Sequence, residues 1–275
     1  ATTYLRLYFV GIPFMLVYNF STSIIRAVGD SKITLKYITI AGIINVCLNL
    51  FFVIVLDMNV AGVAIATTAS QIISALLCIR FFVNYDGCLK LDLKRLVVDK
   101  TELKTILTLG VPTGIQNSMY SISNLIIQMA INSFDSSAIV SGNTAAQNIE
   151  SYIFFVMNSI SAATTTFVSQ NYGAGQIKRI RKVTLISLGF VCIMSVPLSI
   201  ILVAGGRFLL GFYTKVPQEI AIGLIRFSFI GHVYSLCGIM DVLSNSLRGL
   251  GKSTLAMVLT LAGITIDFNP IPSKS

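Results

Sequence analysis

Long apolar runs separated by short polar gaps make up nearly the whole chain. Seven runs are long enough for a membrane helix, which needs about 20 mostly apolar residues, and an eighth is shorter. The runs cover residues 5–26, 34–56, 60–83, 105–133, 138–169, 183–205, 219–246 and 254–266. They are too long for strands and lack the alternation of a membrane barrel. The pattern predicts an all-α polytopic membrane protein with seven or eight transmembrane helices.

The basic residues lie in the gaps and alternate along the chain. Odd-numbered gaps hold fifteen Lys and Arg residues, whereas even-numbered gaps hold two, Arg207 and Lys215. The positive-inside rule therefore predicts that the odd-numbered gaps are cytoplasmic and that the first helix runs from outside to inside. The net charge of +9 follows this topology and does not indicate a nucleic-acid partner.

The composition supports a membrane environment. Hydrophobic residues make up 55% of the chain and charged residues 11%, compared with about 25% charged residues in soluble domains. The chain starts at Ala1 with no basic segment before the first apolar run, so this run is not predicted to be a signal peptide. We expect the chain to be part of a longer protein.

The third gap divides the chain into two parts. It is the longest and most charged gap, and we predict a cytoplasmic linker at residues 85–104, with an interfacial amphipathic helix at 91–96. Residues 1–84 then form one part with three transmembrane helices, and residues 105–275 form the other with four helices and a partial fifth. A short sequence echo, Arg26-Ala-Val-Gly-Asp-Ser31 and Arg248-Gly-Leu-Gly-Lys-Ser253, favours a parallel repeat about an axis along the membrane normal.

Polar residues within the runs are the candidates for a functional site, because each is costly at membrane depth. Three runs carry them at spacings of three, four, seven and eight residues, which place each set on one helical face. The sets are Asn117, Tyr120, Asn124 and Gln128; Asn143, Gln147, Glu150 and Asn158; and Tyr234, Asp241 and Asn245. Together they predict a polar cavity lined by substrate-contacting side chains; the alternative is hydrogen bonding between helices. Asn45 and Asn49 could line a matching cavity in the first part or serve in packing.

Two carboxylates lie well inside a predicted span, Glu150 and Asp241. Burying a charge at mid-membrane costs about 2.5–3.5 kcal/mol even on the insertion scale, so each needs a reason to be there. A carboxyl group at this depth can exchange a proton or bind a hard cation such as sodium with neighbouring oxygens. We predict that one or both carry a coupling cation. The alternative is a structural pair with Arg226 or Arg248.

The sequence indicates neither an enzyme nor a cofactor. The single histidine, His232, has no catalytic triad in a recognisable context, and none of the five cysteines forms a CxxC pair. The segment that ends in Gly251-Lys-Ser-Thr254 lacks the first glycine and the preceding strand of a phosphate-binding loop. No particular metal is indicated.

Seven short segments, in order along the chain, resemble those of the multidrug and toxic compound extrusion (MATE) transporters. Their order and spacing agree with that family up to about residue 260. The segments are Gly11-Ile-Pro13 with Arg26-Ala-Val-Gly29, Asn45-Val-Cys-Leu-Asn49, Val60-Ala-Gly-Val-Ala-Ile-Ala-Thr67, Gly110-Val-Pro112, Ser169-Gln-Asn-Tyr-Gly-Ala-Gly175 and Leu247-Arg-Gly-Leu-Gly-Lys-Ser253.

This resemblance implies twelve helices in two six-helix lobes, of which the chain would hold the fourth to tenth and part of the eleventh. Some subfamilies have an acid near the position of Gln116, which joins the cavity-lining candidates. Asp241 lies in the helix that often carries a coupling carboxylate. Glu150 looks like the acid of bacterial members with an Ala-Gln-Asn-Ile-Glu stretch.

The expected function is export of organic cations or amphipathic drugs in exchange for a proton or sodium ion, with alternating access between two lobes. We expect a multi-pass protein of the cell inner (plasma) membrane that acts as a monomer when full length. One alternative is a lipid or oligosaccharide flippase, which should have a more basic cavity. A seven-helix receptor is less compatible with the two-part repeat, and an intramembrane enzyme would need a catalytic pair.

Overall fold

The computed structural model describes residues 2–85, 87, 89–92, 94, 97–134, 136–231 and 233–267, and its regular elements are helices. The chain divides into two compact units, Ala1–Val98 and Asp99–Ser275. The first helix of the second unit starts at Lys100, five residues before the predicted start of the run. His232 and half of the predicted interfacial helix at 91–96 lie outside the described residues.

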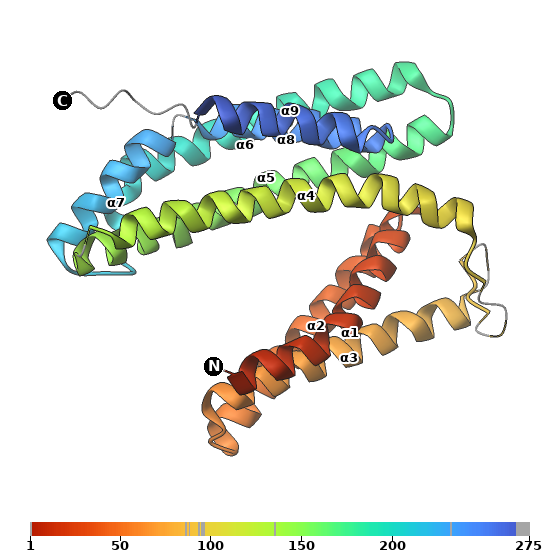
Figure 1. Ribbon diagram of the computed structural model, residues 1–275, viewed down its shortest axis with the longest axis horizontal. Helices are drawn as coiled ribbons and strands as arrows, with labels where there is room; N and C mark the ends of the chain where they lie inside the picture. Colours follow the sequence, from red (N-terminus) through yellow and green to blue (C-terminus); the bar gives the residue numbers. More distant parts are fainter. Residues whose placement is uncertain are drawn as a thin grey trace. The chain divides into compact units, whose positions relative to one another are not determined.

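Over its described residues, the first unit consists of three helices (Figure 1). They are α1 (Thr2–Ala27), α2 (Ser31–Leu50), which continues as a π-helical segment at Phe51–Val55, and α3 (Asn59–Asn84). Helix α3 packs against both α1 and α2. Its buried residues include Ala64, Ala66, Ala75 and Cys78, and such small side chains let membrane helices approach closely.

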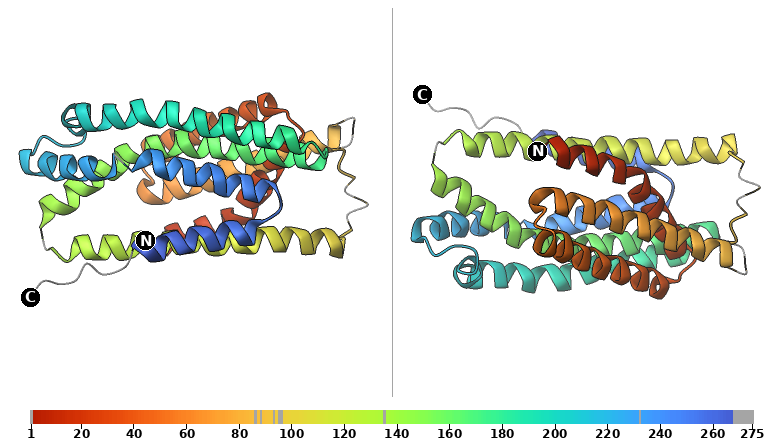
Figure 2. Two further views of the ribbon diagram at one scale, coloured as in Figure 1. Left: turned by 90° about the horizontal axis from the view of Figure 1, so that it is seen from above. Right: turned by 90° about the horizontal axis from the view of Figure 1, so that it is seen from below.

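In the second unit, the described residues form a bundle of six helices centred on α5. The helices are α4 (Lys100–Asn132), α5 (Ser137–Gly173), α6 (Ile177–Leu210), α7 (Pro217–Ile230), α8 (Tyr234–Gly249) and α9 (Ser253–Asp267). Helix α5 packs against α6, α7 and α8, and α9 packs against α4 and α8, as the two views of Figure 2 show. Ala146, Met157, Leu202, Leu210 and Phe227 form the centre of its core. The core therefore joins α5, α6 and α7.

The prediction of one continuous helix over residues 219–246 is wrong. This run forms α7 and α8, which are bent by 53° across the break between Ile230 and Tyr234. A Cβ atom at Gly231 would lie 2.7 Å from the carbonyl oxygen of Phe227 and 2.7 Å from a methyl group of Val203 on α6. The backbone at the break therefore packs so closely against α6 that the position suits glycine. The sequence did not reveal the break, because the apolar run contains no proline.

The described helices fit a polytopic membrane protein. By length and composition, five can cross a membrane, namely residues 8–27, 32–55, 61–84, 137–173 and 177–210, and the bent pair of α7 and α8 would make a sixth. Helix α4 does not pass the same test because its polar residues interrupt the apolar sequence, and the described apolar part of α9 is short. These two helices therefore remain predicted spans.

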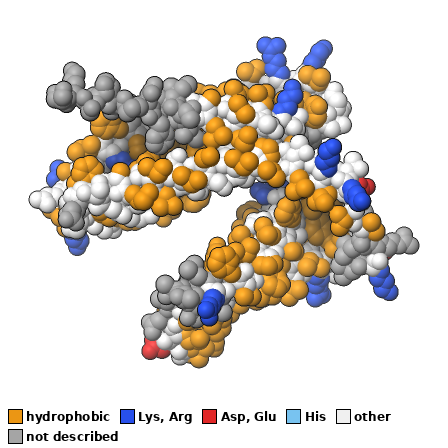
Figure 3. Space-filling view, in the orientation of Figure 1, with side chains coloured by type: hydrophobic (Ala, Val, Ile, Leu, Met, Phe, Trp, Pro, Cys, Tyr) orange, Lys and Arg blue, Asp and Glu red, His pale blue; other side chains and the backbone are white. Residues whose placement is uncertain are grey.

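Hydrophobic side chains cover much of the helix surface. On the face shown in Figure 3, they spread along the flanks of the helices, and most Lys and Arg side chains lie near helix ends. Ile54, Phe208 and Phe229 are each at least 70% exposed. Exposed apolar area of this extent is unfavourable in water and favourable against lipid.

Candidate functional site

One face of α5 carries several buried polar groups of the bundle. Asn143, Glu150 and Thr164 are buried, together with Met157 between them. These positions recur every seven residues, which is two helical turns. Because of this spacing, the amide, carboxylate and hydroxyl groups lie along one buried stripe of α5. This stripe is on the face that packs against α7 and α8.

Glu150 forms a buried ion pair with Arg226 of α7. The Arg226 Nε donates to Glu150 Oε1 at 2.9 Å and to Oε2 at 3.1 Å, and its Nη2 donates to Oε2 at 2.8 Å. The exposed fraction is 7% for the Glu150 side chain and 22% for the Arg226 side chain. The two-pronged geometry is the strong form of this contact. This contact corresponds to the alternative prediction from the sequence, in which Glu150 forms a structural pair with Arg226.

The same guanidinium also contacts a second turn of α5. Arg226 Nη1 donates to Asn143 Oδ1 at 2.7 Å, while the buried Asn143 Nδ2 has no hydrogen-bond partner in the described part of the chain. Tyr234, the first residue of α8, lies within electrostatic range of both Glu150 and Arg226. One arginine therefore joins two turns of α5 beside the start of α8.

A second polar cluster joins α4, α5 and α8; we call it the Asp241 cluster. Arg248 Nη2 donates to Gln116 Oε1 at 2.7 Å, and Arg248 Nη1 contacts Asn245 Oδ1 at 3.4 Å. The hydroxyl of Thr165 on α5 donates to the side-chain and backbone oxygens of Asn245, both at 3.1 Å. The members of the Asp241 cluster are Gln116, Tyr120, Thr165, Asp241, Asn245 and Arg248.

Asp241 has a different environment from Glu150. It is only partly buried, and its carboxylate makes no hydrogen bond to any described residue. Asn245 Nδ2 donates to the backbone oxygen of Asp241 at 2.9 Å, while Arg248 and Tyr120 are within electrostatic range. An uncommitted carboxylate near amide and hydroxyl oxygens can hold a proton or coordinate a small hard cation.

The structure brings several predicted site residues together. Gln116, Tyr120, Asp241 and Asn245 meet in the Asp241 cluster, and Glu150 and Tyr234 lie beside Arg226. Sequence reasoning gave Arg226 only as an alternative partner, although it is the one basic residue in the middle of a predicted run. Thr165 was missed, since a threonine within an apolar run carries no distinguishing signal.

Other predicted cavity residues stand apart from both clusters. Asn117 and Asn124 are exposed on α4, and Gln147 is half-buried on α5. Asn45 belongs to the first unit, where its Nδ2 donates to Ser70 Oγ at 3.0 Å and its Oδ1 accepts from Asn49 at 3.0 Å. A cavity lined by these residues remains a prediction.

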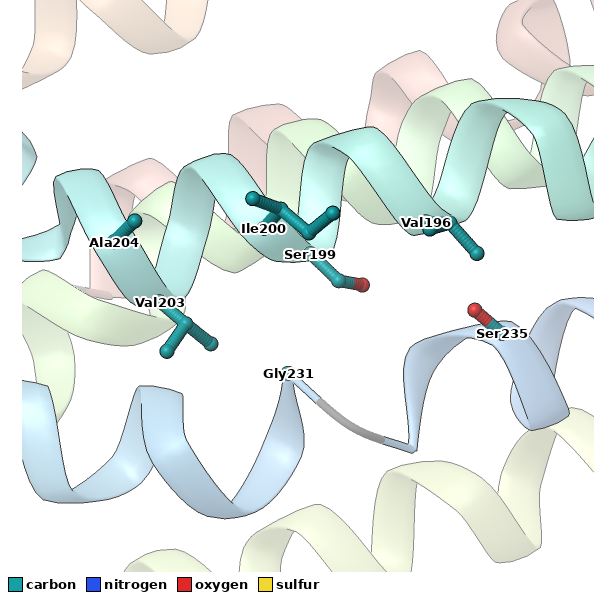
Figure 4. Close-up of a pocket in the computed structure, with 7 residues that line it drawn as sticks. All are labelled: Val196, Ser199, Ile200, Val203, Ala204, Gly231 and Ser235. Atoms are coloured by element: carbon teal, nitrogen blue, oxygen red, sulfur yellow. The ribbon is translucent and has the colours of Figure 1, made fainter.

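An apolar groove of about 330 Å³ lies at the break between α7 and α8 (Figure 4). It is lined by Val196, Ser199, Ile200, Val203, Ala204, Gly231 and Ser235. None of the predicted site residues lines it. Among the described residues, no group of three or more His, Cys, Asp or Glu side chains could hold a metal ion.

Comparison with known families decides the class of protein. Residues 112–270 match the MatE family, a segment that contains both polar clusters. The chain belongs to the MatE family. The predicted family and the predicted all-α polytopic membrane fold are thus confirmed.

Individual relatives agree with this assignment. The chain is 31% identical over 261 residues to the "Probable multidrug resistance protein YpnP" of Bacillus subtilis (strain 168), covering 95% of this chain and 58% of the relative. It is 22% identical over 275 residues to the "FAD transporter" of Shewanella oneidensis, covering 98% of this chain and 60% of that protein. The chain therefore spans less than two thirds of the length of these relatives.

The fold also matches solved structures. The structure of an outward-facing multidrug resistance MATE family transporter of the MOP superfamily aligns with a TM-score of 0.87 at 19% identity, covering 94% of this chain and 58% of that one. At this identity the match concerns the fold.

Proposed function

We propose that the protein containing this chain is a secondary active exporter of organic cations or amphipathic drugs, driven by inward flow of protons or sodium ions. Membership of the MatE family and the similarity to a probable multidrug resistance protein support export of small molecules. The observation that carries the coupling mechanism is Asp241, an uncommitted carboxylate within a polar cluster of three helices. A carboxylate is costly at membrane depth, so its presence there points to a functional role.

The proposed cycle is alternating access. Coupling requires that the cation and the substrate favour different conformations, because a ligand that binds both conformations equally shifts neither. Asp241 lies on the same helix as Arg248 and Asn245, which connect α8 to α4 and α5. Neutralising its charge by a proton or a cation changes the electrostatics of the cluster that holds these helices together. In this way, binding of a cation at Asp241 would change how α8 is arranged against α4 and α5.

The protein would be a multi-pass protein of the cell inner (plasma) membrane, active as a monomer, with no cofactor and no enzymatic activity. The substrate would enter a cavity that includes Asn117, Asn124 and Gln147, whose side chains are available on α4 and α5.

An anionic organic substrate is a second candidate. The Arg248 guanidinium is held by amide oxygens of Gln116 and Asn245, and its buried Nε has no hydrogen-bond partner among the residues that the structure describes. A carboxylate or phosphate group would supply the missing acceptor. A relative of 22% identity named "FAD transporter" is consistent with this substrate class.

The test uses the full-length protein in proteoliposomes. Efflux of a fluorescent organic cation is followed under an imposed proton or sodium gradient, with Asp241→Asn and Glu150→Gln beside the wild type. The proposal expects gradient-driven efflux that Asp241→Asn abolishes. If neither gradient drives efflux of an organic cation while an anionic nucleotide is transported, the second candidate replaces the first.

A further inference from the structure

Arg226 makes more contacts with α5 than an ion pair requires. Three of its hydrogen bonds go to Glu150 and one goes to Asn143. The two α5 residues are seven positions apart and share a face. The planar guanidinium can serve both acceptors at once, which the single ammonium group of a lysine cannot do with the same geometry.

The backbones of α5 and α7 approach closely just beside this contact. A Cβ atom at Gly142 would lie 2.5 Å from the carbonyl oxygen of Glu219, and one at Gly223 would lie 3.4 Å from the carbonyl oxygen of Gly142. Gly223 is three residues before Arg226, which is less than one turn of α7. Glycine contact and the ion pair therefore fix the same stretch of α7 on α5.

We propose that Arg226 is a positioning residue that neutralises Glu150 and fastens α7 to α5, which leaves Asp241 to carry the coupling cation in this bundle. The inference rests on the proposed antiport function. Both Glu150 oxygens already accept charge-assisted hydrogen bonds, so a second cation at this carboxylate would have to displace a guanidinium held by four hydrogen bonds. The Asp241 carboxylate has no such contact among the described residues.

This assignment predicts a pattern that a coupling acid at Glu150 would not produce. Removing one partner of a buried ion pair leaves the other charge unpaired in an apolar environment, which is strongly unfavourable, whereas replacing both partners by neutral groups is often tolerated. Loss of a coupling carboxylate, in contrast, is not repaired by removing a neighbouring arginine.

The experiment is a double-mutant cycle in the full-length protein. Glu150→Gln, Arg226→Gln and the double variant are compared in proteoliposomes for gradient-driven efflux and for its dependence on pH or sodium concentration. Each single variant should lose transport by about tenfold or more, while the double variant should recover most of the rate with the ion dependence of the wild type. Arg226→Lys should fall between wild type and Arg226→Gln. The exposed Arg207→Gln serves as the matched control and should transport normally.

Two transport results would overturn the inference. One is a folded double variant that transports no better than Glu150→Gln, since Glu150 itself would then be needed. The other is a set of single variants with wild-type transport, since neither partner would then position anything.

The thermal stability of the same purified variants separates this inference from the proposed function. If the wild type shows no gradient-driven efflux, the antiport proposal fails and only the part concerning α5 and α7 can stand. That part predicts two destabilised single variants and a double variant near wild type, and stability losses that simply add would contradict it.

Discussion

Asn245 shows how one amide side chain connects three helices. It accepts from Thr165 on α5 and contacts Arg248, which also binds Gln116 on α4, while its own Nδ2 returns to the backbone of Asp241. An amide offers both a donor and an acceptor, so it can hold an arginine and a threonine without adding charge beside Asp241. Neutral side chains thus connect the two charged members of the cluster, Arg248 and Asp241, to α4 and α5.

Thr165→Val tests this contact at the level of a single hydroxyl. Valine keeps the shape but removes the donor to Asn245, and we expect a loss of about 1 kcal/mol of stability. Thr166→Val is the matched control, because among the described residues the Thr166 hydroxyl donates only within its own helix, to the carbonyl of Ala162. Thermal unfolding in detergent measures both. Equal behaviour of the two variants would mean that the contact with Asn245 contributes nothing.

At the scale of helices, α5 and α7 depend on glycine for their approach. Gly142→Ala places a methyl group 2.5 Å from the backbone of Glu219, so the helices must separate, at a cost of about 1–3 kcal/mol. Gly189→Ala on α6 meets nothing within 4 Å and should be neutral or slightly stabilising, because alanine favours helix. The melting temperatures of the two purified variants provide the comparison. A Gly142→Ala protein as stable as wild type would contradict the packing.

The start of α4 should respond to pH through its cap. Asp99 Oδ1 accepts from the backbone N–H of Thr101 at 2.7 Å, and this hydrogen bond holds the pKa of the exposed Asp99 carboxyl below its ordinary value. A depressed pKa means that the stabilisation is present above the ordinary pKa of an aspartate and is lost as pH falls through the lower, folded value.

Hydrogen exchange at residues 101–105 measures this effect. We expect protection at neutral pH and a loss of protection only in strongly acid solution for the wild type. Asp99→Asn should keep a cap without the acid transition, because asparagine is also a good N-cap residue. An identical acid transition in this variant would assign the effect to another group.

Most helices could be predicted from the sequence, but the break between α7 and α8 could not. Run length and gap charge locate the helices, because the bilayer fixes both. The break depends on how Gly231 packs against Val203 of α6, which is a tertiary contact. The same limit applies to the site. The spacing of Asn143 and Glu150 places them on one face of α5, but only the packing of α7 shows that Arg226 donates hydrogen bonds to both.

At the scale of the whole molecule, the charge pattern predicts the topology. The first turns of α6 carry Lys178 and its basic neighbours, so the junction between α5 and α6 should be cytoplasmic, while the loop that holds Lys215 should be external. In a cysteine-free background, a membrane-impermeant maleimide should label Lys215→Cys in intact cells. It should label Gln176→Cys only after permeabilisation. The reverse pattern would invert the orientation of every helix.

The central claim is that Asp241 couples the flow of a cation to the export of a substrate. Coupling between two ligands is reciprocal, so a substrate gradient alone must move the ion. The most direct measurement is therefore ion movement in proteoliposomes that are given an organic-cation gradient and no ion gradient, with the internal pH or sodium content followed over time. We predict opposite flow of protons or sodium ions for the wild type and none for Asp241→Asn, although the variant still binds the organic cation. Ion flow that persists in Asp241→Asn would contradict the account.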